Sequence, residues 1–165
     1  DTRADGVWTG EPGWPCVVLT ADCLPVLLAR QDGSAVAAVH AGWRGLHGGI
    51  LGRAVATLAP GGEPLSAWLG PAISARAYQV GEDVHRAFVS LGPEYQAAFS
   101  RDSRPNHWRF SLAHAATLAL NAAGVFEVAG GDHCTASDPV HFYSYRAEGQ
   151  TGRFATMVWL EPAPA

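Results

Sequence analysis

The chain has 165 residues, of which 48% are apolar and 16% are charged, and its net charge is −4. All eleven basic residues are arginines, which excludes a Schiff-base lysine or the lysine of a phosphate-binding loop. Neither a basic stripe for nucleic acid nor a run of about 18 apolar residues for a membrane span is present, so we expect no nucleic acid and no membrane as partners.

We expect a single domain over residues 1–165, because a chain of this length and composition can bury a core of its own. Its three cysteines are unevenly spaced and do not form a disulfide framework. They therefore indicate free thiols in a reducing, cytoplasmic setting.

The first forty residues predict β-structure. Three short apolar runs are typical of strands: residues 16–20, 26–30 and 35–40. Residues 1–15 are rich in Gly and Pro and indicate a loop or an edge segment. Pro25 indicates a bend or bulge before the second strand, and residues 31–34 have the composition of a hairpin turn.

This hairpin is expected to bring two reactive side chains together. Cys23 precedes its first strand, and His40 ends its second strand. Antiparallel pairing places the start of one strand beside the end of the other. We therefore expect the thiol of Cys23 and the imidazole of His40 to be neighbours.

The middle of the chain predicts helices. Apolar residues at helical spacing predict a helix over residues 44–59 with one buried face, formed by Leu46, Ile50, Ala54 and Leu58. A second helix is expected over residues 82–91, one or two further turns at residues 93–99, and a third helix from an N-cap at Ser111 to Ala123. Between them, residues 66–69 predict a strand, residues 73–84 a connector, and residues 101–107 a loop.

The last third returns to β-structure. Residues 125–129 predict a strand, and residues 142–160 predict two strands around a turn at residues 148–152. Strands at both ends with helices between them indicate a mixed α/β or α+β domain.

Three interpretations of Cys23 and His40 fit the sequence. The two side chains could be ligands of a zinc ion, His40 could be the general base for a nucleophilic Cys23, or the pair could be a buried thiol and a core histidine. A zinc site needs a third protein ligand. The candidates are His47, His133, Cys134 and His141, and the sequence places none of them beside Cys23.

Arginines supply the candidate anion contacts. Arg44 lies in a Gly-Trp-Arg-Gly corner at the expected start of a helix, a position suited to phosphate. Arg146 and Arg153 flank the expected C-terminal hairpin. The alternative for each is an arginine solvated at the surface.

Four segments in this order resemble the YfiH-like family, also called the laccase-domain or polyphenol oxidase-like family: TADCLPVLL, AVHAGWRGL, LGPAISARAYQVGEDV and CTASDPVHFYSYRAEGQTGRFA. The resemblance covers residues 5–160. It implies an α/β (α+β) sandwich with a mixed sheet and helices, similar to the fold of cytotoxic necrotizing factor toxins. It also implies that the domain is truncated at its N-terminus.

The resemblance implies a purine nucleoside enzyme. Its expected activities are the phosphorolysis of adenosine, inosine, guanosine and methylthioadenosine, and adenosine deamination. The family's His, Cys and His metal site makes Cys23 and His40 the expected zinc ligands, with copper in the older description. Cys23, His40 and Arg44 are expected to act in catalysis, and Arg44 and Arg146 to bind substrate. The first metal histidine of the family lies upstream of Cys23, where this chain has no histidine.

Two positions depart from the family pattern. Gln79 stands where the family often has Glu, and Ala147 where it usually has Arg. Three alternatives stay open: a metal-free cysteine hydrolase or deamidase with a Cys23–His40 dyad, a laccase-like polyphenol oxidase, and a binding domain without catalysis. Multicopper oxidation would need many more histidine ligands than the two or three available here, which disfavours the second. The oligomeric state is open, a monomer included.

Overall fold

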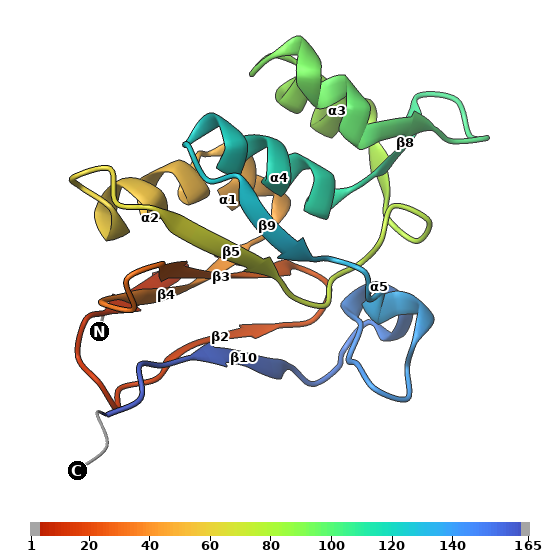
Figure 1. Cartoon of the computed structure of the whole chain (residues 1–165). Coiled ribbons are helices and arrows are strands. Elements are labelled where there is room, and N and C mark those ends of the chain that lie inside the picture. Colours follow the sequence, from red (N-terminus) through yellow and green to blue (C-terminus); the bar gives the residue numbers. More distant parts are fainter. Residues whose placement is uncertain (1–3, 163–165) are drawn as a thin grey trace.

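The computed structural model describes residues 4–162. Its centre is a five-stranded sheet with the order β1-β4-β3-β5-β9 (Figure 1). The strands are β1 (Gly6–Thr9), β3 (Leu24–Arg30), β4 (Val36–Ala41), β5 (Leu65–Leu69) and β9 (Glu127–Gly130). All neighbours pair antiparallel except β5 and β9, which are parallel. The predicted hairpin is confirmed as β3 and β4 at the centre of this sheet.

A second sheet consists of β2 (Cys16–Thr20) and β10 (Phe154–Val158), which pair antiparallel. It lies on one face of the five-stranded sheet (Figure 1). A small buried cluster joins the two layers, with Cys16 and Val18 of β2 against Val36 and Ala38 of β4. Strands β2 and β3 are consecutive in the sequence but belong to different sheets, so the segment between them crosses from one layer to the other.

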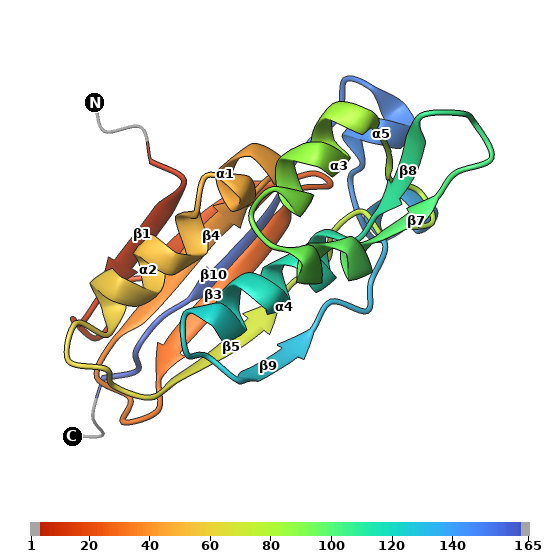
Figure 2. The ribbon, with the colours of Figure 1, turned by 90° about the horizontal axis from the view of Figure 1, so that it is seen from above.

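Helices cover the opposite face of the five-stranded sheet (Figures 1 and 2). They are α1 (Trp43–His47), α2 (Ile50–Leu58) and α4 (Leu112–Ala122). The main core lies between these helices and the sheet, where Leu28 of β3, Leu51 of α2 and Leu120 of α4 are fully buried. The prediction for α4 is confirmed, because the hydroxyl of Ser111 accepts a hydrogen bond from the backbone N–H of His114 at 3.1 Å.

A third, smaller sheet with the order β6-β8-β7 extends the molecule at one end (Figure 2). It contains β6 (Gln79–Gly81), β7 (Phe99–Arg101) and β8 (His107–Phe110), and α3 (Glu82–Val89) and the 3-10 helix η1 (Pro93–Ala98) belong to the same region. Phe99 and Phe110 stack in its core with ring centroids 4.4 Å apart. The loop predicted over residues 101–107 is confirmed between β7 and β8, and only its end residues belong to these strands. The connector predicted over residues 73–84 is wrong in one respect, because it contains β6, a strand of three residues that is too short to show a period.

The predicted helix over residues 44–59 is wrong in one respect. It is divided into α1 and α2 at Gly48 and Gly49, and Gly49 has a φ of 79°. The break shifts the helical phase by one residue. The buried face therefore consists of Leu46, Leu51, Val55 and Leu58, and Ile50 and Ala54 are only partly buried.

The predicted C-terminal hairpin is also wrong. Only its second strand exists, as β10, and this strand pairs with β2. The first half contains the 3-10 helix η2 (Thr135–Ser137), a loop and the short helix α5 (Tyr145–Glu148). Ser144 caps α5 by accepting a hydrogen bond from the backbone N–H of Ala147 at 3.2 Å.

The mixed α+β class predicted from the sequence is confirmed, with one mixed sheet, two smaller antiparallel sheets and helices on one face. Within residues 4–162, no helix combines the length and apolar character that a bilayer crossing requires.

Candidate active site

Strand register places Cys23 beside His40. Pro25 of β3 faces His40 of β4, and Leu24 faces Ala41, so Cys23 stands one residue before the paired segment. A Cβ atom on Gly42 would lie 3.1 Å from Cys23 Sγ and 3.8 Å from His40 Nε2. Both reactive atoms therefore face the same small space, and neither residue is fully buried. A buried thiol and a core histidine do not describe this pair.

Asp5 orients the imidazole of His40. Its Oδ1 lies 3.1 Å from His40 Nδ1, and its backbone carbonyl accepts a hydrogen bond from the His40 backbone N–H at 2.7 Å. A carboxylate on Nδ1 leaves Nε2 directed at Cys23. The contacts with Cys23 and then Asp5 outweigh burial and raise the pKa of His40 to about 9.

A cavity of about 500 Å³ opens beside this pair and gathers the predicted site residues. Its walls include Cys23, His40, Arg44, Arg146 and Arg153. Tyr78, Trp43, Ile73 and Leu112 supply aromatic and apolar surface to the same cavity. The sequence alone does not predict that Arg146 lies near Cys23. The two residues are far apart in the chain, and a loop and a short helix place Arg146 at the cavity.

Arg146 is held at three points. Its backbone N–H donates to Asp22 Oδ2 at 2.6 Å, its Nη1 donates to the backbone carbonyl of Gln79 at 3.1 Å, and its guanidinium lies 5.0 Å from the ring centroid of Tyr78. Burial, followed by the nearby thiol of Cys23, raises the pKa of Tyr78 to about 12. The phenol is therefore protonated at neutral pH and can donate a hydrogen bond to a ligand.

Asp22 joins the Cys23 segment to α5. Asp22 is 8% exposed as a residue, and its Oδ1 also accepts a hydrogen bond from Thr135 Oγ1 at 2.6 Å. Its φ of 87° lies in the left-handed region, which Asp tolerates better than most residues. This conformation lets the chain leave β2, turn a carboxylate inward and enter β3.

Arg44 lies on α1, where its guanidinium stacks 4.4 Å from the ring centroid of its neighbour Trp43. Arg153 is exposed, and its Nη1 donates to the backbone carbonyls of Thr151 and Gly152. The guanidinium of Arg153 is therefore hydrogen-bonded within its own loop, whereas Arg44 lines the cavity with its guanidinium stacked on Trp43.

The four candidates for a third metal ligand lie elsewhere. His47 packs edge-on against Phe88, and His141 contacts Asp138 at 2.9 Å. His133 and Cys134 belong to the loop before α5, where Cys134 Sγ accepts hydrogen bonds from Ser74 and Ser137. Across residues 4–162, no three His, Cys, Asp or Glu side chains are arranged to hold a metal ion. Cys23 and His40 therefore form no complete metal site with any of these four residues.

Three residues of the site are missed by reasoning from the sequence: Asp5, Asp22 and Tyr78. Asp22 stands next to Cys23, and an acidic residue before a candidate ligand was the one local signal available. Asp5 and Tyr78 reach the site only through the pairing of β1 with β4 and through the approach of the segment before β6.

Fold and site together define an α+β domain with a Cys–His pair at the edge of a central hairpin and arginines in the wall of the same cavity. The family described as Multi-copper polyphenol oxidoreductase laccase matches residues 1–161. The chain belongs to this family, which confirms the resemblance to YfiH-like proteins.

Curated relatives carry the name purine nucleoside phosphorylase. One from Pseudomonas aeruginosa is 46% identical over 159 residues, which cover 96% of this chain and 66% of the relative. The YfiH protein of Escherichia coli is 42% identical over 158 residues, which cover 96% of this chain and 64% of the relative. The chain thus spans a little under two thirds of the length of these proteins.

Solved structures share the fold. The Neisseria meningitidis protein NMB0706 superposes with a TM-score of 0.91 at 45% identity, over 96% of this chain and 65% of that protein. A hypothetical protein YfiH from Bacillus licheniformis has a TM-score of 0.88 at 28% identity, over 95% of this chain and 61% of that protein.

Proposed function

We propose that this chain carries the nucleoside and phosphate site of a purine nucleoside phosphorylase. The observation that supports it is one cavity lined by Cys23 and His40 together with Arg44 and Arg146. The name purine nucleoside phosphorylase, which curated relatives carry, also supports the proposal. The proposed substrates are adenosine, inosine, guanosine and methylthioadenosine, each with phosphate.

The cavity has the size and surface for a nucleoside. Its volume of about 500 Å³ falls within the common range for small-molecule sites. Trp43 and Tyr78 offer aromatic surface to a purine, and Leu112 offers apolar surface. The protonated phenol of Tyr78 can donate a hydrogen bond to an acceptor on the ligand.

Two arginines suit the phosphate. Guanidinium groups bind phosphate oxygens by charge-assisted hydrogen bonds, often two at a time. Arg44 stands on the Cys–His side of the cavity, and Arg146 is directed from α5 by Asp22 and Gln79. Phosphate held between them would be oriented for attack on the sugar.

Phosphorolysis forms a bond between a phosphate oxygen and C1′ of the ribose and breaks the bond between C1′ and the purine nitrogen. The bonding electrons leave with the purine, which takes up a proton. Orientation and charge stabilisation supply most of the rate in such a reaction. In the proposed reaction the arginines hold the nucleophile, and the Cys23–His40 pair, which lines the same cavity, acts on the sugar or the base.

Zinc and adenosine deamination remain part of the proposal. A zinc ion could polarise a ligand or activate water, but residues 4–162 supply only Cys23 and His40 toward it. No step above depends on a metal. Metal analysis of the purified protein, compared with a Cys23→Ala variant, tests whether these two side chains contribute to a zinc site.

The test of the proposal is turnover. The protein is incubated with each of the four nucleosides, with and without phosphate, and the free base and inosine are separated by chromatography. We expect phosphate-dependent release of base, lost in Cys23→Ala and retained in Cys134→Ala, because Cys134 lies outside the cavity. Absence of both base and inosine would contradict the proposal, as would equal activity of the two variants.

A second candidate is a metal-free cysteine hydrolase or deamidase. The imidazole of His40 lies between the thiol of Cys23 and the carboxylate of Asp5, which contacts Nδ1. This is the arrangement that activates a thiol nucleophile. Activity that survives complete chelation and ends on alkylation of Cys23 would favour this candidate. Phosphate dependence would favour the phosphorylase.

A further inference from the structure

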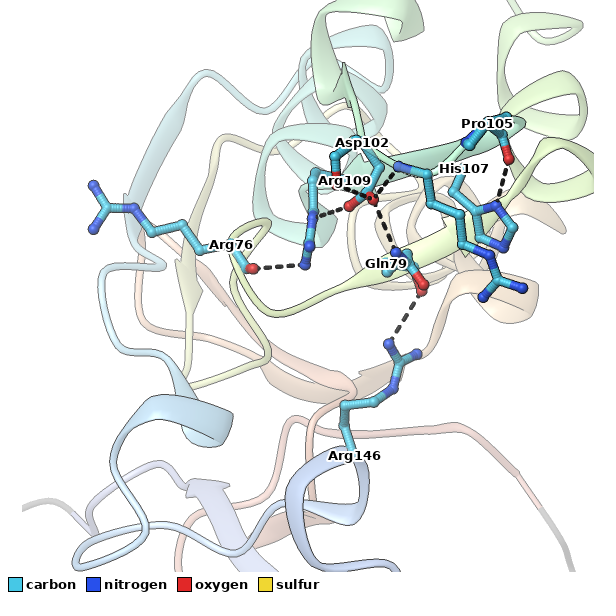
Figure 3. Close-up of polar contacts among 9 residues, drawn as sticks. Arg76, Gln79, Asp102, Pro105, His107, Arg109 and Arg146 are labelled. Atoms are coloured by element: carbon cyan, nitrogen blue, oxygen red, sulfur yellow. Dashed lines mark hydrogen bonds and ion pairs between the residues drawn. The ribbon is translucent and has the colours of Figure 1, made fainter.

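The guanidinium of Arg146 depends on a backbone atom of another segment. Its Nη1 donates to the carbonyl oxygen of Gln79 at 3.1 Å (Figure 3). The same guanidinium lies over the ring of Tyr78, the residue before Gln79. The position of Arg146 in the cavity therefore follows the position of residues 78 and 79.

Strand β6, which begins at Gln79, is only three residues long. It pairs with β8 on one side, with Gln79 opposite Arg109, and it is one of the two edge strands of its sheet. So short an edge strand has few ladder hydrogen bonds to fix it. The backbone just before it is held by Tyr78, whose carbonyl accepts a hydrogen bond from the Phe110 N–H at 3.0 Å. A side-chain contact can therefore add to what holds Gln79 in place.

The side chain of Gln79 supplies that contact. Its Nε2 donates to Asp102 Oδ1 at 3.0 Å (Figure 3). The side chain of Asp102 is 2% exposed, forms an ion pair with Arg109, and accepts a hydrogen bond from the backbone N–H of Arg104 at 2.9 Å. Arg109 in turn donates to the carbonyl of Arg76 at 2.8 Å. The amide of Gln79 thus contacts a buried carboxylate that is also paired with Arg109.

We propose that Gln79 is a positioning residue for Arg146, which it holds through its backbone carbonyl while its side-chain amide is fastened to Asp102. The inference rests on the proposed function, in which Arg146 binds phosphate. The role of the amide is assigned for this chain, in which position 79 faces Asp102, although the YfiH-like family often has Glu at this position. A carboxylate at this position would face Asp102 as a like charge, or would turn to Arg146 and neutralise it.

The test begins with Gln79→Glu. We expect the KM for phosphate to rise about tenfold, the effect of losing one charge-assisted hydrogen bond, with little change in the KM for the nucleoside. In the double variant Gln79→Glu, Asp102→Asn, the amide and carboxylate exchange places and the contact can form again. Its KM for phosphate is expected to fall back to within about threefold of that of Asp102→Asn alone.

Two further variants separate positioning from general stability. Gln31→Glu makes the same change on an exposed hairpin turn, and its KM for phosphate should equal that of the wild type. In an Arg146→Ala background, Gln79→Glu should add nothing, because its effect is transmitted through Arg146. An equal tenfold effect in that background would overturn the inference.

Calorimetric titration with inorganic phosphate makes the outcome independent of turnover. Weaker phosphate binding by Gln79→Glu and by Arg146→Ala than by the wild type supports the inference. Equal phosphate affinity in all three proteins overturns it, whether or not a nucleoside is cleaved. Absence of released base in the wild type concerns the proposed function alone and is read from a different assay.

Discussion

At the scale of single residues, the contact between Asp5 and His40 determines which imidazole nitrogen is available to other groups. The carboxylate of Asp5 occupies Nδ1 and leaves Nε2 for Cys23 or for a ligand. A histidine placed between a thiol and a carboxylate binds its proton more tightly than a histidine in water. The charge of the pair is therefore linked to the stability of the fold.

This linkage predicts a pH dependence. The folded state holds the pKa of His40 at about 9, above its ordinary value of 6.5. Protonated His40 thus stabilises the fold fully below about pH 6.5, and this contribution is lost as the pH rises through 9. Because the side chain is 34% exposed, we expect a loss of about 1 kcal/mol in the free energy of unfolding.

Urea unfolding at pH 6 and pH 9, in the presence of a chelator, measures this loss. His40→Gln should remove most of the difference, and Asp5→Asn should reduce it. His114→Gln is the control, because His114 is exposed on α4. The prediction fails when the wild type and His40→Gln lose equal stability over this range.

The residue scale also shows what the sequence could reveal. The pairing of Cys23 with His40 follows from one turn and two apolar runs, which are local signals. Asp22 meets Thr135 and Arg146 across more than a hundred residues, and no local pattern records such a contact. The sequence therefore predicts the centre of the site but not the residues that orient it.

At the scale of elements, a break between two helices sets the position of Arg44. Helix α1 ends at His47, and Gly49, the N-cap residue before α2, lies in the left-handed region with a φ of 79°. The two helices can then follow different directions over the sheet. Arg44 stands on the short first helix, close to His40 at the end of β4.

Two glycines near this break should respond in opposite ways to substitution by alanine. Gly49→Ala forces a Cβ into the left-handed region, which costs about 1–2 kcal/mol. Gly52 is exposed inside α2, and a Cβ there meets nothing within 4 Å. Gly52→Ala should stabilise the protein by about 0.5–1 kcal/mol. Thermal unfolding of the two variants checks both signs, and a loss of stability in each would contradict this account.

Elements with a clear period were predictable, and the others were not. Strands β2, β3, β4 and β5 and helix α4 show apolar patterns or caps in their own sequences. The segment around α5 is rich in aromatic residues, a composition that is typical of a strand. It forms a capped helical turn because Asp22 binds the backbone of Arg146, which is a tertiary effect.

At the scale of the whole molecule, three layers place the three cysteines at different depths. Cys16 is 1% exposed between the two sheets, Cys23 lies at the cavity, and Cys134 lies in the loop after β9. Burial raises the pKa of Cys16. Burial would also raise the pKa of Cys134, but hydrogen bonds from Ser137 and Ser74 outweigh it and lower that pKa.

Thiol reactivity should report this arrangement. In a brief treatment of the native protein with iodoacetamide, we expect Cys23 and Cys134 to be alkylated at least about tenfold faster than Cys16, because the reagent needs an accessible thiolate. Inosine together with phosphate should slow the alkylation of Cys23 and leave Cys134 unchanged, since only Cys23 lines the cavity. Peptide mass spectrometry distinguishes the three sites, and the denatured protein, in which all three react, is the control. Rapid labelling of Cys16 would contradict the layered packing, and equal protection of Cys23 and Cys134 would show that the ligands bind outside the cavity.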